Sequence, residues 1–337
     1  MSSEQPSSLC FWISCDLLQT LLKSLANVAI STHLYFHPSR GIYAQVLDQH
    51  QRLFGEFALH PSCLELTEHV NEDPNVAPLD IPIYFEGLLD FISYLQKSFT
   101  VKFWPVLRCL QALEIDREIA TGCYTYSVQE DVVYIPAQIV EVFPPVNLQN
   151  YPFAVTISCA EFSRQIEQAL IDSECIQIAM CGRFLIFYTE SDGRAQTIIP
   201  CKRLTADNRI CRQGMQDVGV AAASTDTNNP SNQLVHLDGI PEPCLIQLHS
   251  LRYLSLMCKA RHSTDTVMVG MSEHFGLAVV FPLRGYGLSR LNNKGVLDEE
   301  SYFRYRLYPD PNAKRPLLPL FETAKAHLTR KFKADFH

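Results

Sequence analysis

GIYAQVLDQHQRLFGEFAL, residues 41 to 59, contains two short runs of alternating apolar residues. Such alternation is typical of half-buried β-strands, because successive side chains of a strand point to opposite faces. The polar tetrapeptide Asp48-Gln49-His50-Gln51 separates the two runs. The stretch therefore predicts two strands joined by a polar corner, and it carries no obvious catalytic group.

Amphipathic helices are predicted on both sides of this strand pair. Residues 16 to 30, DLLQTLLKSLANVAI, place leucines at three-and-four spacing with polar residues between them. The middle of residues 81 to 103 has the same helical spacing, and its end, FTVKF, alternates like a strand. Two further strands are predicted at residues 109–119 and 120–134.

The second half of the chain repeats this order of elements. They are, in sequence, a helix at residues 159–172, strands at IQIAM, RFLIFYT and TIIP, an extended loop at 203–243, a helix at 244–263 and a strand pair at 265–283 that turns at Ser272-Glu273-His274. The loop contains STDTNNPSNQ, which cannot bury much apolar surface. A repeat of this size indicates a duplicated domain.

Chain length agrees with a two-domain α+β protein, since 337 residues exceed the usual size of a single core. The expected division is an N-terminal domain at residues 1–138, a proline-containing connector at 139–153, a C-terminal domain at 154–310 and a C-terminal extension at 311–337. Hydrophobic residues make up 47% and charged residues 19% of the chain, which is typical of globular proteins.

Composition also limits the classes of function. No apolar run reaches the ~18 residues of a membrane helix, and the N-terminus does not have the pattern of a secretory signal, so we expect a soluble intracellular protein without membrane contact. The twelve cysteines form no CxxC pair, which favours buried thiols in a reducing compartment. A net charge of −8 argues against nucleic-acid binding over the whole surface and leaves a local basic face open.

Motifs of enzyme active sites are absent from the sequence. It contains no GxxxxGK[ST], GxGxxG after a strand, HExxH or GxSxG. The histidines between residues 33 and 60 have no metal-ligand spacing, and the acidic run at residues 298–300 is better interpreted as a solvated loop. We therefore expect no enzymatic activity, no cofactor and no metal.

Several segments, taken in order, resemble one protein family. Gly41-Ile42, Gln45, Leu47 and Asp48 after an amphipathic helix are similar to the first-domain hairpin of the proliferating cell nuclear antigen (PCNA) family of DNA sliding clamps. The matches continue through Glu161-Phe162, Arg164 and Ile166 with the following hairpin, LRYLSLMCKAR at residues 251–261, TVMVGMSEHFGLAVVFPL with Met271-Ser272 and Leu277, and FRYRLYP at 303–309. The resemblance spans roughly residues 16 to 309.

This resemblance implies two similar DNA-clamp domains, with helices packed on antiparallel sheets, and a ring of subunits around duplex DNA. Such a ring tethers DNA polymerase and other replication and repair proteins without reading DNA sequence. The expected assembly is a homotrimer in the nucleus, or in the viral replication compartment for a viral member. Residues 203–243, 285–301 and 311–337 depart from the family as insertions or extensions, so the chain resembles a divergent member.

The resemblance also implies residues that contact DNA phosphates from the polar faces of the helices. These candidates are Lys23, Lys97, Arg164, Arg252, Lys259 and Arg261. The alternative for each is an ordinary solvated helix charge. Glu86 and Asp90 oppose Lys97 on the second helix of the first domain, and the tail cations Lys325, Arg330, Lys331 and Lys333 either contribute to DNA binding or belong to a short solvated helix.

Partners of clamps insert a short helical segment, with two aromatic residues and one aliphatic residue, into an apolar pocket. The residues implied for this pocket are Leu47, Val146, Leu148, Tyr151, Gly276, Leu277, Leu307 and Pro309. Packing in the core is the alternative for each of them. Arg306 and Tyr308 stand where the family has apolar or small residues, which predicts a different partner specificity.

Three other interpretations remain open at this point. The chain is a subunit of a hetero-oligomeric checkpoint-type clamp, a monomeric or dimeric processivity factor of the viral kind, or a structural or interaction protein that does not bind DNA. The thin basic lining of the first domain and the long insertions favour the first two of these alternatives.

Overall fold

The computed structural model describes residues 9–37, 41–59, 65–66, 79–94, 98–104, 109–116, 119–127, 151, 153–181, 184–189, 196–200, 202–203, 232–235, 244–259, 265–283 and 301–309. These residues form an α+β structure with antiparallel sheets and few helices. The chain divides into two compact units. The first comprises Met1–Pro145, Phe281–Arg290 and Asp298–Arg304, and the second comprises Val146–Val280, Leu291–Leu297 and Tyr305–His337.

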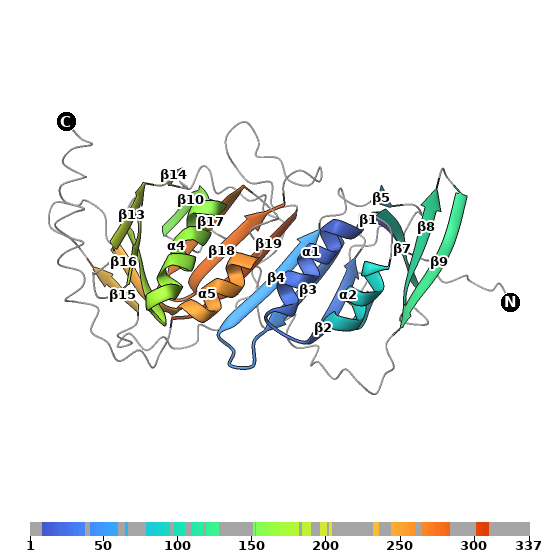
Figure 1. Ribbon diagram of the computed structural model, residues 1–337, viewed down its shortest axis with the longest axis horizontal. Coiled ribbons are helices and arrows are strands. Elements are labelled where there is room, and N and C mark those ends of the chain that lie inside the picture. The colour runs from blue at the N-terminus through green and yellow to red at the C-terminus, as the bar shows by residue number, and fades with distance from the viewer. Residues whose placement is uncertain are drawn as a thin grey trace. The chain divides into compact units, whose positions relative to one another are not determined.

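The described residues of the first unit form two helices and two antiparallel sheets (Figure 1). Its elements are β1 (Leu9–Ser14), α1 (Cys15–Ala26), β2 (Ser31–His37), β3 (Gly41–Leu47), β4 (Leu53–Leu59), β5 (Glu65–Leu66), β6 (Leu79–Tyr84), α2 (Phe85–Ser93), β7 (Ser98–Trp104), β8 (Cys109–Asp116) and β9 (Ile119–Ser127). One sheet has the order β5-β1-β7-β8-β9, and the other includes β4-β3-β2-β6. The two helices pack against each other.

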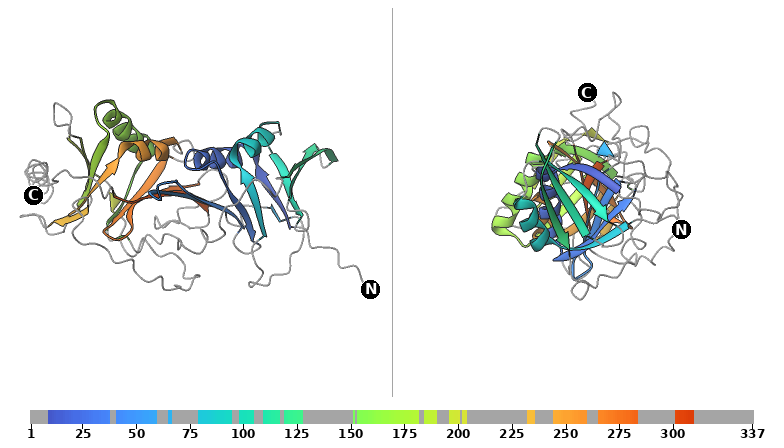
Figure 2. Two further views of the ribbon diagram at one scale, coloured as in Figure 1. Left: turned by 90° about the horizontal axis from the view of Figure 1, so that it is seen from below. Right: turned by 90° about the vertical axis from the view of Figure 1, so that its right-hand side faces the viewer.

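The second unit has the same kinds of elements in the same order. They are β10 (Phe153–Ser158), α4 (Cys159–Asp172), β11 (Cys175–Cys181), β12 (Phe184–Tyr188), β13 (Gln196–Pro200), β14 (Lys202–Arg203), β15 (Asn232–Val235), β16 (Cys244–Ser250), α5 (Leu251–Cys258), β17 (Thr266–Ser272), β18 (Gly276–Pro282) and β19 (Ser301–Leu307). One sheet has the order β13-β12-β11-β16-β15, and the other runs β14-β10-β17-β18 and continues into β19. Figure 2 shows that in each unit the helix pair lies on one side of the sheets.

Strand pairing establishes that the two units are a structural repeat. The order β5-β1-β7-β8-β9 of the first unit corresponds to β14-β10-β17-β18-β19, and β4-β3-β2-β6 corresponds to β13-β12-β11-β16. The register agrees as well: β1 pairs with β7 from Leu9↔Phe103 to Ser14↔Ser98, and β10 pairs with β17 over an equally long run from Phe153↔Met271 to Ser158↔Thr266. Strand order and register are therefore alike in the two units.

The helices form because one face of each is apolar and can be buried against the sheets. On α1 the buried face consists of Leu17, Leu18, Leu21, Leu22 and Leu25. On α4, Phe162 and Ile166 are fully buried, and Phe162 meets Phe187 of β12 edge to face with ring centroids 6.0 Å apart. The polar faces of both helices remain outward, which leaves their charged side chains accessible.

Asp48 explains the polar corner between β3 and β4. Its Oδ1 accepts hydrogen bonds from the backbone N–H groups of Arg52 at 2.5 Å and Leu53 at 2.6 Å, while Oδ2 accepts one from the N–H of His50 at 3.0 Å. The backbone of Gln51 has a φ of 56°, in the left-handed region. A buried carboxylate with three backbone donors therefore holds the turn, which is a structural role.

Replacing Asp48 with Ala should lower the free energy of unfolding by about 2 to 4 kcal/mol, because three backbone donors lose a charged acceptor at a mostly buried site. Asp48→Asn keeps one acceptor oxygen, so its free energy of unfolding should lie between those of Asp48→Ala and the unaltered protein. Chemical denaturation measures these differences, with Gln49→Ala as an exposed control in the same turn. Equal stability of Asp48→Ala and the unaltered protein would contradict this role for the carboxylate.

Some predicted elements differ in the structure. The helix predicted at residues 244–263 is strand β16 followed by the short helix α5, because leucines at helical spacing continue from the strand into the helix. β15 lies within the segment predicted as an extended loop at residues 203–243. Strands β1, β6 and β10, each directly before a helix, are additional to the predicted elements.

Cysteine chemistry in the described segments also differs from the expectation. Cys159, Cys175 and Cys258 are thiols, as the sequence predicts, whereas Cys181 at the end of β11 is disulfide-bonded. The expectation of a thiol is therefore wrong for Cys181. Among the residues of the described segments, no helix is long and apolar enough to cross a membrane.

Candidate functional site

Four of the predicted DNA-contact residues are exposed along the described helices. Lys23 lies on α1, Arg164 on α4, Arg252 on α5, and Lys259 directly after α5. The side chains of Lys23 and Arg252 form no hydrogen bond or ion pair with any residue in the described segments. Both can therefore meet an incoming phosphate without breaking an existing interaction there. Lys97 and Arg261 lie outside the described residues.

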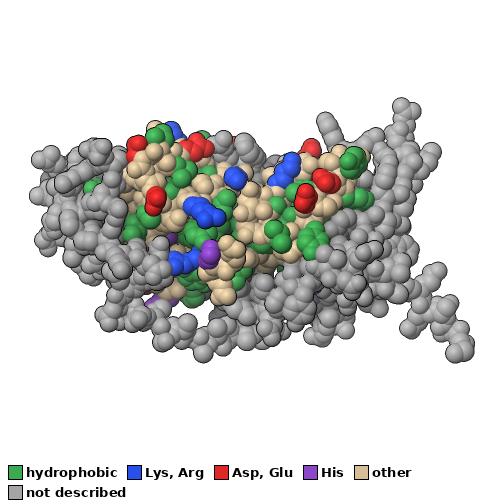
Figure 3. All heavy atoms as spheres, turned by 60° about the horizontal axis from the view of Figure 1, so that its bottom comes forward, with side chains coloured by type: hydrophobic (Ala, Val, Ile, Leu, Met, Phe, Trp, Pro, Cys, Tyr) green, Lys and Arg blue, Asp and Glu red, His purple; other side chains and the backbone are tan. Residues whose placement is uncertain are grey.

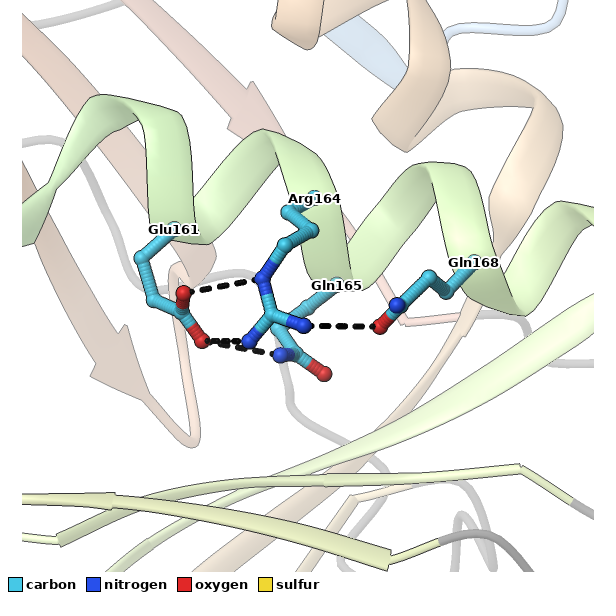
Figure 4. Close-up of polar contacts among 4 residues, drawn as sticks. All are labelled: Glu161, Arg164, Gln165 and Gln168. Carbon is cyan, nitrogen blue, oxygen red and sulfur yellow. Dashed lines mark hydrogen bonds and ion pairs between the residues drawn. The ribbon is translucent and has the colours of Figure 1, made fainter.

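Arg164 on α4 is exposed, and it is paired within its own helix (Figure 4). Its Nε and Nη2 donate to the two carboxylate oxygens of Glu161 at 3.0 and 2.6 Å, and its Nη1 donates to Gln168 at 3.3 Å. The hydrogen bonds from Arg164 lower the pKa of the Glu161 carboxyl, so Glu161 stays ionised and offsets the charge of Arg164. This candidate is less able to bind phosphate than Arg252.

Carboxylates are at least as frequent as cations on the described helices. In the first unit, Lys23 stands against Asp16, Glu86 and Asp90. The second unit has a closer balance, with Arg164, Arg252 and Lys259 against Glu161, Glu167 and Asp172. On the face that Figure 3 shows, basic and acidic side chains are interspersed over the described surface without a continuous patch of either sign. Any attraction of these helices for DNA must therefore be weak and concentrated on α5.

Four predicted docking residues come together in the second unit. Tyr151 packs against the backbone of β17, where a Cβ on Gly270 would lie 3.1 Å from its ring. Gly276 begins β18 with a φ of 70°, and a Cβ there would lie 2.4 Å from the carbonyl oxygen of Leu307. Glycine is therefore required where β18 meets the end of β19. Leu277 and Leu307 are buried beside this contact.

The predicted docking residues differ in how much of their surface a partner could reach. Tyr151, Leu277 and Leu307 are at most 1% exposed, so they pack in the core of the second unit. Pro309 is partly exposed, as is Leu47 in β3 of the first unit. Val146 and Leu148 lie outside the described residues.

Phe275 and Tyr308 are accessible aromatic residues next to this core. Both are partly exposed, and the ring of Phe275 lies 6.1 Å from that of Tyr151. Phe275 is not among the residues predicted from the sequence, although an aromatic residue beside the expected turn at Ser272-Glu273-His274 was a signal for it. A partner segment would touch these two side chains before any of the buried ones.

β19 presents charged and aromatic side chains on one face. Successive residues of a strand point to opposite sides, so Tyr302, Arg304 and Arg306 share a direction, and Tyr308 follows directly after the strand. Tyr305 points the other way: burial raises its pKa, and Cys258 of α5 is close enough to add to the shift. Arg306 therefore lies on the face of β19 opposite to Tyr305.

Arg304 is buried with a matching carboxylate. Its Nη2 lies 2.5 Å from Oε1 of Glu56 in β4, and both side chains are 4% exposed. Glu56 also accepts hydrogen bonds from the Tyr302 hydroxyl at 2.6 Å and from Gln45 at 3.0 Å, while the guanidinium of Arg304 lies 4.8 Å from the centre of the Tyr302 ring. Each charge of this buried pair is therefore offset by the other.

Arg306 is equally buried, at 3% exposure, and differs in its surroundings. Its Nη1 donates to the Tyr308 hydroxyl at 3.3 Å, and its guanidinium lies 5.6 Å from the centre of the Phe275 ring. The Nε atoms of both arginines have no hydrogen-bond acceptor among the described residues, but only Arg306 also has no described carboxylate within 4.0 Å of its guanidinium. A buried charge in this condition lowers stability.

Methionine substitutions should separate the two arginines, because methionine approximates the length of the side chain without its charge. Arg304→Met leaves Glu56 buried without its cation and should cost about 3 to 5 kcal/mol of unfolding free energy. Arg306→Met removes a buried charge that no described carboxylate offsets, and it should be neutral or stabilising by about 1 to 4 kcal/mol. Chemical denaturation of both variants measures the contrast.

An equally large loss of stability in Arg306→Met and Arg304→Met would contradict this assignment. It would mean that Arg306 has a carboxylate partner elsewhere in the chain. As a control, the slope of unfolding free energy against denaturant concentration should be the same for all the proteins, which shows that the variants differ in stability alone.

Groups that could bind a metal ion do not assemble in the described segments. No cluster of three or more His, Cys, Asp or Glu side chains there could hold one. His249 is completely buried and shares a hydrogen bond of 3.2 Å with Gln247. Burial lowers the pKa of His249 to about 3, so it remains neutral at physiological pH and does not act as a titrating group there.

Comparisons with known proteins identify no family. No protein-family model matches the sequence, and no curated protein matches it significantly.

Proposed function

We propose that this protein is a PCNA-like sliding clamp, which encircles duplex DNA and tethers DNA polymerase and other replication or repair proteins. The observation that carries the proposal is the structural repeat of two units, each with a helix pair on one side of its sheets. The ordered sequence matches from residue 16 to 309 support it independently. Tethering by encirclement needs no catalytic group.

Sheet edges in the repeat suggest how copies of the chain join. In the first unit, Ser301–Arg304 of β19 lies beside β4, as the contacts of Arg304 and Tyr302 with Glu56 indicate. The equivalents of β19 and β4 are β9 and β13, and each of these ends its sheet among the described strands. Open edges readily pair with another chain. We propose that β9 of one copy pairs with β13 of the next.

Pairing of two different edges is a head-to-tail contact, which closes into a ring when the rotation between copies allows it. The resemblance to clamps favours three copies. The helices would then face duplex DNA, and the contacts with phosphate would be weak and independent of sequence. Arg252 and Lys259 are the best placed of the candidates, since α5 itself contains no carboxylate.

A second candidate is a subunit of a hetero-oligomeric checkpoint-type clamp, or a processivity factor that acts as a monomer or dimer. The excess of carboxylates on the helices of the first unit favours it, because a ring of three identical copies would repeat that acidic surface three times. In a mixed ring, other subunits would supply the cations. An interaction protein that does not bind DNA would instead show no salt-sensitive affinity for duplex.

Substitution of both Arg252 and Lys259 by Ala should weaken association with duplex DNA and flatten its dependence on salt. The slope of log K against log salt should decrease by about 0.9 for each phosphate that the variant no longer neutralises. Fluorescence anisotropy of a labelled duplex across a salt series measures both quantities. Arg164→Ala is the matched control and should change them less, because Glu161 already offsets this charge.

Unchanged affinity and slope in the double variant would remove these residues from the DNA-contact surface. A larger effect of Arg164→Ala than of the double variant would place the contact on α4 instead. Absence of any salt-sensitive affinity in the unaltered protein would favour the interaction protein over the clamp.

A further inference from the structure

We propose that Arg306 is a receptor for a carboxylate, and that partner segments docking on the second unit carry an acidic residue that pairs with it. This inference rests on the proposed function, since it concerns the partners of the clamp, and it adds a chemical requirement beyond the apolar docking that the resemblance implies. The observation behind it is a buried guanidinium that no carboxylate of the described residues offsets.

The two arginines of β19 provide an internal comparison. Arg304 and Arg306 are two residues apart on the same face of one strand, and both are almost completely buried. Arg304 has Glu56 at 2.5 Å, whereas the described neighbours of the Arg306 guanidinium are the Tyr308 hydroxyl and the ring of Phe275. Burying a guanidinium is costly unless a carboxylate or phosphate offsets it. An acidic group from a partner would form with Arg306 the kind of buried ion pair that Glu56 forms with Arg304.

The buried guanidinium of Arg306 has two partly exposed aromatic neighbours. Phe275 and Tyr308 are both partly exposed, so the buried charge lies between two accessible aromatic side chains. A guanidinium beside aromatic faces binds a planar carboxylate well, because its N–H groups form a fork that matches two oxygens. The aromatic side chains would contact the apolar residues of the same partner segment.

Duplex DNA is not the source of this anion. Arg306 and Tyr305 are consecutive residues of β19 and point to opposite faces of the strand, and it is Tyr305 whose pKa Cys258 of α5 helps to raise. Arg252 and Lys259, the proposed phosphate contacts, are on α5. A phosphate backbone held at α5 would not reach the opposite face of β19. The occupant is therefore the acidic residue of a protein partner.

The test uses pairs of synthetic peptides and the full-length protein. Each peptide contains two aromatic residues and one aliphatic residue as a helical docking segment, with a single Glu placed at successive positions around the aromatic pair. The second peptide of each pair has Gln in place of that Glu. For at least one position, the Glu peptide should bind about tenfold more tightly than the Gln peptide.

Variants of the protein assign this preference to one residue. Arg306→Met should bind the Glu and Gln peptides equally, and Arg306→Lys should retain part of the preference because it keeps the charge without the fork. Glu174→Gln is the control: it removes an exposed charge of the second unit away from all the proposed contacts and should retain the full preference. Thermal unfolding of each variant establishes that it is folded.

Three results would overturn the inference. Equal binding of Glu and Gln peptides at every position would remove the carboxylate requirement while leaving apolar docking in place. A preference that persists in Arg306→Met would assign the acid to another residue. Lack of binding by every peptide would overturn the inference together with the docking role, and the DNA and assembly measurements would then decide separately whether the chain is a clamp.

Discussion

Antiparallel pairing between the first strand of each unit and the strand after its second helix is the constraint on which the architecture depends. β1 pairs with β7 and β10 pairs with β17. In both cases the two helices of the unit, and the strands between them, separate the paired strands in sequence. This pairing places both helices of a unit on the same side and leaves the polar helix faces outward. Because it occurs twice, each structural position in one unit has a counterpart in the other.

Charge placement distinguishes the surfaces that the fold creates. The described helix faces combine a few cations with more numerous carboxylates, which suits a ring that moves along DNA better than a protein that grips it. The opposite face of β19 contains two buried guanidinium groups, and a carboxylate of the described residues offsets the first but not the second. Retaining the second at a cost in stability is understandable if a partner completes it, since functional sites often lower stability.

Local pattern was sufficient to predict some elements and insufficient for others. The hairpin at residues 41–59 followed from alternation on both sides of Asp48, and α1 and α4 followed from leucine and isoleucine spacing. The run from Leu245 to Leu254 did not reveal where β16 ends and α5 begins, because leucines recur at every third residue throughout it and indicate a helix over both elements. At the candidate site, Leu277 and Leu307 were recognisable as apolar, but whether they face a partner or the core depends on contacts distant in sequence.

Ion pairs between residues far apart in the sequence could not be predicted from local sequence patterns either. Arg304 and Glu56 are far apart in the chain, and only the position of β19 beside β4 brings them together. Arg306 was noticeable as a departure from the family, yet its burial beside two aromatic side chains is a property of the folded structure.

The central claim, a closed ring formed by copies of this chain, is tested most directly by the mass of the purified protein in solution. Light scattering across a concentration series should find a stable species at three times the 38.3 kDa of the chain. A monomer at every concentration would contradict the homotrimeric ring and favour a chain that requires other subunits or acts alone.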